Sequence, residues 1–148
     1  MKKLCVASIA CLALPALFWL TCIHYTENYQ LGIKWNFVTG GLQADDAAGL
    51  HITPPWIRIS RIDTRPMRVC ITTAGRGFNC RLVQFDAKYY REFVATEGFR
   101  YWWWANRISF NLGYSDEYRG MKDLLRGYAY SAKQYPFVIT LKEYEEGE

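Results

Sequence analysis

The sequence of 148 residues has only two histidines and lacks the residue patterns on which most active sites are built. His24 and His51 are far apart in the chain, so they form no metal-binding motif. We interpret His51 as a packed or hydrogen-bonding side chain rather than a catalytic base. No serine lies in a nucleophile-elbow sequence, and Gly75-Arg76-Gly77 is too short for a phosphate-binding loop. We therefore predict that the chain is not an enzyme and that it holds no cofactor or metal.

A dense cluster of positive charge is also missing. The chain has 18 Lys and Arg against 14 Asp and Glu, a formal net charge of +4. That excess is mild and spread along the sequence, which predicts no nucleic-acid partner. Internal repeats and low-complexity segments are absent as well. Aromatic residues make up 17% of the chain, so it can bury ample apolar area and we expect it to fold.

Charged residues are absent from Leu4 to Ile23, directly after Lys2 and Lys3. A helix of about 20 apolar residues spans roughly 30 Å, the thickness of a bilayer's hydrocarbon core. The run therefore predicts a transmembrane helix, with membrane lipid as a partner. Because the lysines precede it, we expect a single-pass protein with a cytoplasmic N-terminus and its body on the far side.

Two other interpretations of this run remain. A cleaved signal peptide has a shorter apolar core, although Ala13-Leu14-Pro15-Ala16 is a conceivable cleavage site. A lipoprotein would use Cys11 or Cys22, but the apolar run before Cys11 is short and bulky residues precede Cys22. We favour an uncleaved anchor over residues 1–23, followed by a body over residues 24–148.

The body shows strand patterns first and helix patterns later, which predicts an α+β fold. Strands are expected over residues 29–38, 50–52, 56–62, 67–72, 78–85 and 137–144. Asp86 can cap a helix that ends before Gly98, and Ser115 opens a second helix that Pro136 ends. Residues 100–112 fit a helix or a strand equally well.

Cys70 and Cys80 flank the glycines of a predicted hairpin. A hairpin centred on Gly75 sets the two cysteines opposite each other, where they can form a cross-strand disulfide in an oxidising compartment. A two-residue turn would shift the register and leave two buried free thiols instead. Both outcomes remain open from the sequence.

The most unusual cluster in the body is Tyr101-Trp102-Trp103-Trp104. Aromatic side chains favour buried cores, the centres of protein interfaces and the membrane–water boundary. All three roles remain open for this cluster. As a candidate interface we group it with the helix face of Tyr118, Met121 and Leu125.

Residues 29–66 resemble the start of the SPFH (band 7) domain, the family of stomatins, prohibitins and flotillins. Members of that family carry a strand with a glycine, a Gly-Leu-His run, a Pro-aromatic pair and an Asp-x-Arg run at similar distances. The residues that carry the resemblance, which we interpret as structural, are Gly32, Gly40, Gly49, His51, Pro54, Pro55, Trp56, Asp63 and Arg65.

The resemblance implies a small SPFH-like α+β domain of antiparallel strands followed by helices, placed after the transmembrane anchor. It further implies a non-catalytic, membrane-anchored scaffold that forms homo-oligomers and organises membrane or regulates membrane proteins, including membrane proteases. The alternative is a membrane-tethered or secreted enzyme, or a small-ligand-binding domain with an aromatic-rich pocket.

Overall fold

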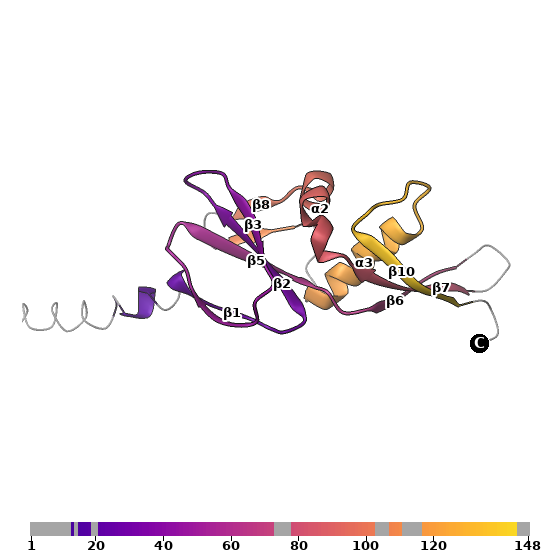
Figure 1. The fold of residues 1–148 in the computed structure, drawn as a ribbon, viewed down its shortest axis with the longest axis horizontal. Helices are drawn as coiled ribbons and strands as arrows, with labels where there is room; N and C mark the ends of the chain where they lie inside the picture. The colour runs from indigo at the N-terminus through magenta and orange to yellow at the C-terminus, as the bar shows by residue number, and fades with distance from the viewer. Residues whose placement is uncertain are drawn as a thin grey trace, which may run out of the picture.

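The computed structural model describes residue 13 and residues 15–18, 21–72, 78–102, 107–110 and 117–144. They form a small, elongated α+β body made mostly of strands (Figure 1). The strands are β1 (Ile23–Thr26), β2 (Gln30–Asn36), β3 (Leu42–Asp45), β4 (Gly49–Ile52), β5 (Ile57–Asp63), β6 (Met67–Thr72), β7 (Phe78–Phe85), β8 (Arg100–Trp102), β9 (Arg107–Ser109) and β10 (Val138–Tyr144). The helical elements are the 3-10 helix η1 (Ala87–Tyr89) and the α-helices α2 (Tyr90–Glu97) and α3 (Glu117–Ala129).

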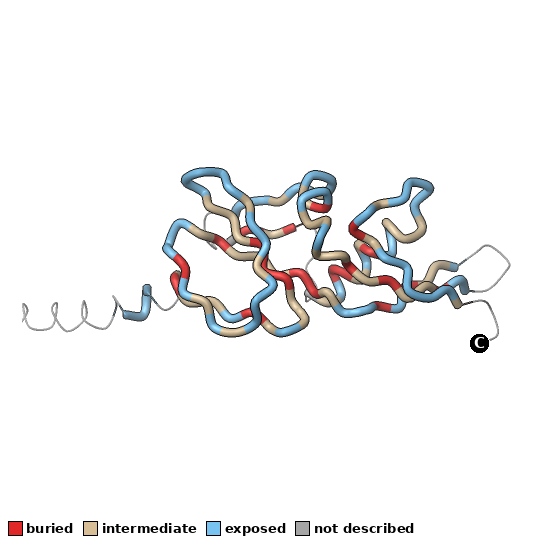
Figure 2. The backbone as a smooth tube through the Cα atoms, viewed as in Figure 1, coloured by how far each residue is buried: buried red, intermediate tan, exposed pale blue. Residues whose placement is uncertain are grey.

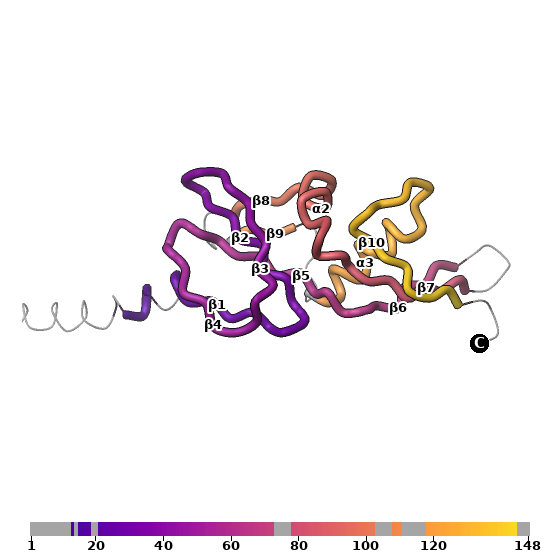
Figure 3. The backbone as a smooth tube through the Cα atoms, in the orientation of Figure 1, coloured from indigo at the N-terminus to yellow at the C-terminus, as the bar shows by residue number. Residues whose placement is uncertain are grey.

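Two three-stranded antiparallel sheets form the two halves of the body (Figure 3). The first has the order β3-β2-β5, and the second has the order β10-β7-β6. The link from β5 to β6 joins the halves, and α3 contacts strands on both sides of that link. The β1–β4 ribbon and the short β8–β9 pair belong to the half that contains β2 and β5.

One hydrophobic core joins the halves, and its buried residues run along the middle of the molecule (Figure 2). It takes side chains from both sheets, from α2 and α3, and from the loop before β10. Its members are Leu31, Ile33, Ile62, Met67, Val69, Val83, Phe85, Phe93, Phe110, Met121, Leu125 and Phe137.

The six predicted strands correspond to β2, β4, β5, β6, β7 and β10, and the helix limits follow local signals. Asp86 accepts a hydrogen bond from the Lys88 amide at the start of η1, and Gly98 ends α2 with a positive φ of 69°. Within residues 100–112, the described residues resolve as β8, β9 and Phe110. The second helix ends at Ala129 rather than at Pro136. The chain then turns back, and the rings of Tyr128 and Tyr135 pack with their centroids 4.5 Å apart.

The predicted membrane span requires a correction. Among the residues that the structure describes, no helix is long and apolar enough to cross a membrane. The end of the apolar run belongs to the body: Cys22 is buried, its carbonyl accepts a hydrogen bond from Thr53, and Ile23 begins β1. The fold prediction that began with a transmembrane helix is therefore wrong on this point. The single-pass localisation with a cytoplasmic N-terminus is wrong with it.

Candidate functional site

An exposed group of apolar side chains lies where the β2–β3 hairpin, the turn before β5 and strand β8 meet. Phe37, Trp56 and Tyr101 are 44%, 45% and 41% exposed, and Val38 is exposed further. The Phe37 and Tyr101 rings stack with 6.5 Å between centroids, and the Phe37 amide donates to the Trp56 carbonyl. We call Phe37, Val38, Trp56 and Tyr101 the aromatic surface.

Tight turns place two parts of this surface. The Asn36 side chain accepts hydrogen bonds from the amides of Val38 and Thr39, and Gly40 completes the hairpin turn with φ at 70°. These contacts hold Phe37 at the hairpin tip. On the other side, the Ile57 amide donates to the Pro54 carbonyl across a turn that presents Trp56.

Trp35 and Phe99 support the aromatic surface. The Trp35 ring lies 5.4 Å from Phe99 and 5.4 Å from Tyr101, centroid to centroid. Because an aromatic side chain has about 150–250 Å² to bury, the half-exposed rings and Val38 present on the order of 300–400 Å². Exposed apolar patches of that size are often functional.

The structure divides the interface that the sequence suggested. Tyr101 and Trp102 are exposed, as an interface requires. Met121 and Leu125 have no exposed surface and belong to the core, so the prediction for them is wrong. Tyr118 packs against that core, and Trp103 and Trp104 lie outside the described residues. No pattern in the sequence marks Phe37 as exposed, since its exposure depends on its place at the tip of the β2–β3 hairpin.

The residues that carry the SPFH resemblance hold the first half in shape. Gly49 has a φ of 118°, which side chains rarely adopt, and a Cβ on Gly32 would lie 3.3 Å from the Asp45 carbonyl. Asp63 is buried and pairs with Arg65. These four residues therefore serve local geometry and packing, whereas Trp56 belongs to the aromatic surface.

Cys70 and Cys80 form a disulfide. They are directly paired in the register of β6 and β7, with Cα atoms 4.1 Å apart. The alternative of two free thiols does not apply, because the hairpin keeps the register in which the cysteines face each other. Cys22 is the free cysteine among the described residues.

The structure also brings together the two histidines that the sequence separates. His24 in β1 is directly paired with His51 in β4. The His51 ring donates to the Ala47 carbonyl at 2.8 Å, and its other nitrogen lies 3.6 Å from the Asp45 carboxylate. No metal-ligating cluster exists among the described residues.

The hydrogen bond from Lys34 holds the pKa of Asp45 below its ordinary value.

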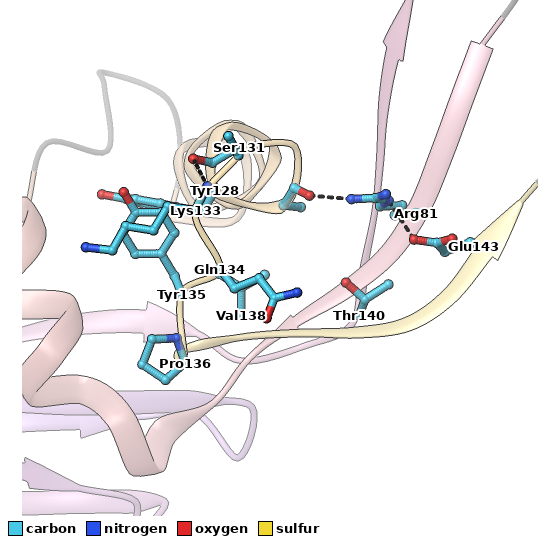
Figure 4. Close-up of a pocket in the computed structure, with 12 residues that line it drawn as sticks. Arg81, Tyr128, Ser131, Lys133, Gln134, Tyr135, Pro136, Val138, Thr140 and Glu143 are labelled. Atoms are coloured by element: carbon cyan, nitrogen blue, oxygen red, sulfur yellow. Dashed lines mark hydrogen bonds and ion pairs between the residues drawn. The ribbon is translucent and has the colours of Figure 1, made fainter.

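A polar cleft of about 670 Å³ lies between the end of α3, the loop over residues 131–136 and β10 (Figure 4). On one wall, Arg81 donates to the Ala129 carbonyl at 2.5 Å and forms an ion pair with Glu143 at 2.9 Å. On the other wall, the Lys133 ammonium lies over the Tyr135 ring. The arrangement suits a small polar ligand, since both signs of charge are present.

Two tyrosines near this cleft stay protonated over a wider pH range than usual. Burial raises the pKa of Tyr128, and its hydrogen bond to Glu97 adds to the effect. Burial also raises the pKa of Tyr130, whose hydroxyl donates to the Asn79 carbonyl at 2.7 Å. Both hydroxyls therefore act as hydrogen-bond donors at neutral pH.

Comparison of the chain with models of protein families, with curated proteins and with solved structures gives no match. The SPFH resemblance stays a prediction, as do the partners that it implies.

Proposed function

We propose that this chain is a non-catalytic scaffold domain that associates with further copies of itself. The observation that carries the proposal is the aromatic surface, which lies outside the hydrophobic core. Aromatic residues are enriched at the centres of protein interfaces, where each ring buries a large area at little cost in side-chain entropy. The resemblance of residues 29–66 to SPFH domains supports the same proposal.

The aromatic surface is arranged as an interface centre should be. Its rings come from three segments of the chain, so the fold fixes their relative positions before any partner arrives. Preorganised side chains lose less entropy on binding. The Arg58 guanidinium lies 5.7 Å from the Phe37 ring centroid and adds a cation–π contact that stiffens the hairpin tip.

A size measurement tests the proposal. We expect wild-type protein to show a concentration-dependent increase in mass by sedimentation velocity, and we expect Phe37→Ser with Tyr101→Ser to shift it toward the monomer. The matched control is Ile139→Ser with Leu141→Ser on β10. Those two side chains are 39% and 48% exposed, but they lie in the other half of the body.

Circular dichroism melting must show that both double variants are folded. A wild type that stays monomeric at every concentration contradicts the proposal. An equal loss of mass in the control and test variants contradicts the assignment of the aromatic surface.

The cleft beside β10 favours a second candidate function, the binding of a small polar ligand. Its volume lies in the range of ligand sites, about 300–1,000 Å³. Screening a set of small carboxylates, amines and amides by NMR tests it. Shifts confined to Lys133, Gln134, Tyr135 and their neighbours, lost in Lys133→Ala, would favour this candidate. Shifts at no cleft residue would exclude these ligand classes.

A further inference from the structure

The β1–β4 ribbon is attached to the body by its polar face. Side chains alternate between the faces of a strand, so Ile23, Tyr25, Leu50 and Ile52 share one face and His24, Thr26 and His51 share the other. Tyr25, Leu50 and Ile52 are each more than half exposed, whereas Thr26 is buried. A Cβ on Gly32 of β2 would lie 3.7 Å from the Thr26 hydroxyl, so this polar face meets the sheet.

The two histidines on that face meet charges of opposite sign. His24 lies near Arg58 and Arg61 of β5 and Lys34 of β2. Its Nε2 atom is buried and has no hydrogen-bond partner among the described residues. His51 instead has its Nδ1 atom 3.6 Å from the carboxylate of Asp45 on β3.

The two rings therefore have different surroundings. His51 faces the carboxylate of Asp45, which also pairs with Lys34. A proton on His24 would place a further positive charge close to Arg58, Arg61 and Lys34. The backbone of Thr21 hydrogen-bonds to the ring and offsets part of this cost, but the buried Nε2 atom has no acceptor in the part of the chain that the structure describes.

We propose that His24 makes the β1–β4 ribbon a proton-sensitive latch, which holds the ribbon on the β3-β2-β5 sheet at neutral pH and releases it in acid. The rest of the body keeps its structure, because the ribbon contributes no side chain to the hydrophobic core and the β10-β7-β6 sheet lies in the other half of the molecule.

The direction of the pH dependence follows from the environment of His24. Burial lowers the pKa of His24 below its ordinary value of 6.5, and Arg61 and Arg58 lower it further. The released ribbon binds the proton more readily than the docked ribbon does. The latch is therefore strongest above pH 6.5, weakens as the pH falls, and reaches its weakest state below the pKa of the docked His24.

The test combines two NMR measurements on the whole chain, histidine titration and amide exchange. We expect protection factors of the β1 and β4 amides to fall between pH 7.5 and pH 5.5, by up to roughly tenfold per pH unit below 6.5. Protection in β6, β7 and β10 should stay constant. His24→Gln should remove the pH dependence, and the matched variant His51→Gln should keep it.

Equal protection of the ribbon at both pH values overturns the proposal, as does a parallel loss of protection in β6 and β7. A pH dependence that disappears in His51→Gln rather than His24→Gln also overturns it. If His24→Gln does not fold, Arg61→Gln replaces it. Removing that cation should move ribbon opening to lower pH, and an unchanged opening pH would contradict the latch.

Discussion

Arg65 donates from Nε to both carboxylate oxygens of Asp63, each at 3.0 Å, and its backbone amide donates to one of them at 2.9 Å. Asp63 is only 2% exposed, so this is a buried carboxylate with a charged partner. The Arg65 guanidinium in turn lies over the rings of Tyr29 and Tyr118, 4.1 Å and 4.9 Å from their centroids. The pair therefore connects the end of β5 with the turn that precedes β2, through Tyr29, and with α3, through Tyr118.

Replacing Asp63 should destabilise the body. Asp63→Ala removes a buried carboxylate that accepts four hydrogen bonds from Arg65, and we expect it to lower the free energy of unfolding by about 3 kcal/mol. Urea denaturation followed by circular dichroism measures this change. The control is Asp123→Ala, which breaks an exposed pair with Arg126 on α3 and should change stability by about 0.5 kcal/mol or less. If the two substitutions changed the free energy of unfolding equally, the burial of Asp63 would make no contribution to stability.

The sequence places an arginine two residues away from Asp63 on each side, and the structure pairs Asp63 with Arg65. Residues two positions apart in the chain can bring their side chains together. From the sequence alone, Arg61 and Arg65 are equally good candidates for the ion-pair partner of Asp63. Tyr118 is far away along the chain and reaches Arg65 only because α3 folds back onto the link between the sheets. The burial of Asp63 depends on such tertiary contacts. A local sequence pattern can therefore suggest an ion pair, but it does not show how much that pair contributes to stability.

The disulfide should contribute to stability mainly by restricting the unfolded chain. The two cysteines are 10 residues apart, and closing a loop of that length corresponds to about 2.5–3 kcal/mol. We therefore expect a reducing agent to lower the urea midpoint of the wild type. Cys70→Ser should start at the lower midpoint and show no further change on reduction. Since Cys22 is free, Cys22→Ser should keep the response to reduction, and a midpoint insensitive to reduction in the wild type would rule out the bond.

Gly40 and Gly49 should differ in their tolerance of other residues. Gly40 has a φ of 70°, in the left-handed region that asparagine adopts readily, so Gly40→Asn should cost only a few tenths of a kcal/mol. Gly49 has a φ of 118°, outside that region, and Gly49→Asn should cost about 1–3 kcal/mol. Neither site has an atom within 4 Å of an added Cβ, so the difference isolates backbone strain. Thermal melting of the two variants measures the difference. Equal melting midpoints for Gly40→Asn and Gly49→Asn would contradict this prediction.

The Lys34–Asp45 pair should make part of the stability sensitive to strong acid. The hydrogen bond from Lys34 lowers the pKa of Asp45 below its ordinary value of 3.8. The contribution is therefore complete above pH 3.8 and is lost as the pH falls through the lower pKa of the folded state. Carboxyl carbon NMR should show Asp45 titrating at lower pH in the wild type than in Lys34→Met. If Asp45 titrated at the same pH in Lys34→Met, a group other than Lys34 would be responsible for its lowered pKa.

The apolar and aromatic patterns show how far a sequence can be interpreted. Alternation along Gln30–Asn36 and a capping Asp86 predict elements that the structure contains, because these signals act within a few residues. The prediction of a membrane span from the run over residues 4–23 was wrong, because composition alone does not reveal that Cys22 at its end is buried in the body or that Ile23 begins β1. The pairing of His24 with His51 was not foreseen, because the register of β1 with β4 depends on the whole intervening chain.

The aromatic core around Phe93 provides the sharpest contrast with the aromatic surface. Phe93 is fully buried, and its ring lies 5.1 Å from Phe85, 5.2 Å from Phe110 and 5.4 Å from Phe137, centroid to centroid. The pairs with Phe85 and Phe137 are edge-to-face, and pairs of this kind add about 0.5–1.5 kcal/mol beyond the area that they bury.

Phe93→Ala should therefore lower the free energy of unfolding by about 3–5 kcal/mol, through lost burial and the cavity left behind. That loss is a large part of the stability of a small domain, so the variant should melt well below the wild type or fail to fold. Phe37→Ala on the aromatic surface removes the same atoms from a half-exposed site and should cost less than about 1.5 kcal/mol. Calorimetric melting of both variants separates core from surface. A Phe37→Ala variant as unstable as Phe93→Ala would mean that Phe37 supports the fold, and it would remove the basis for assigning the aromatic surface to self-association.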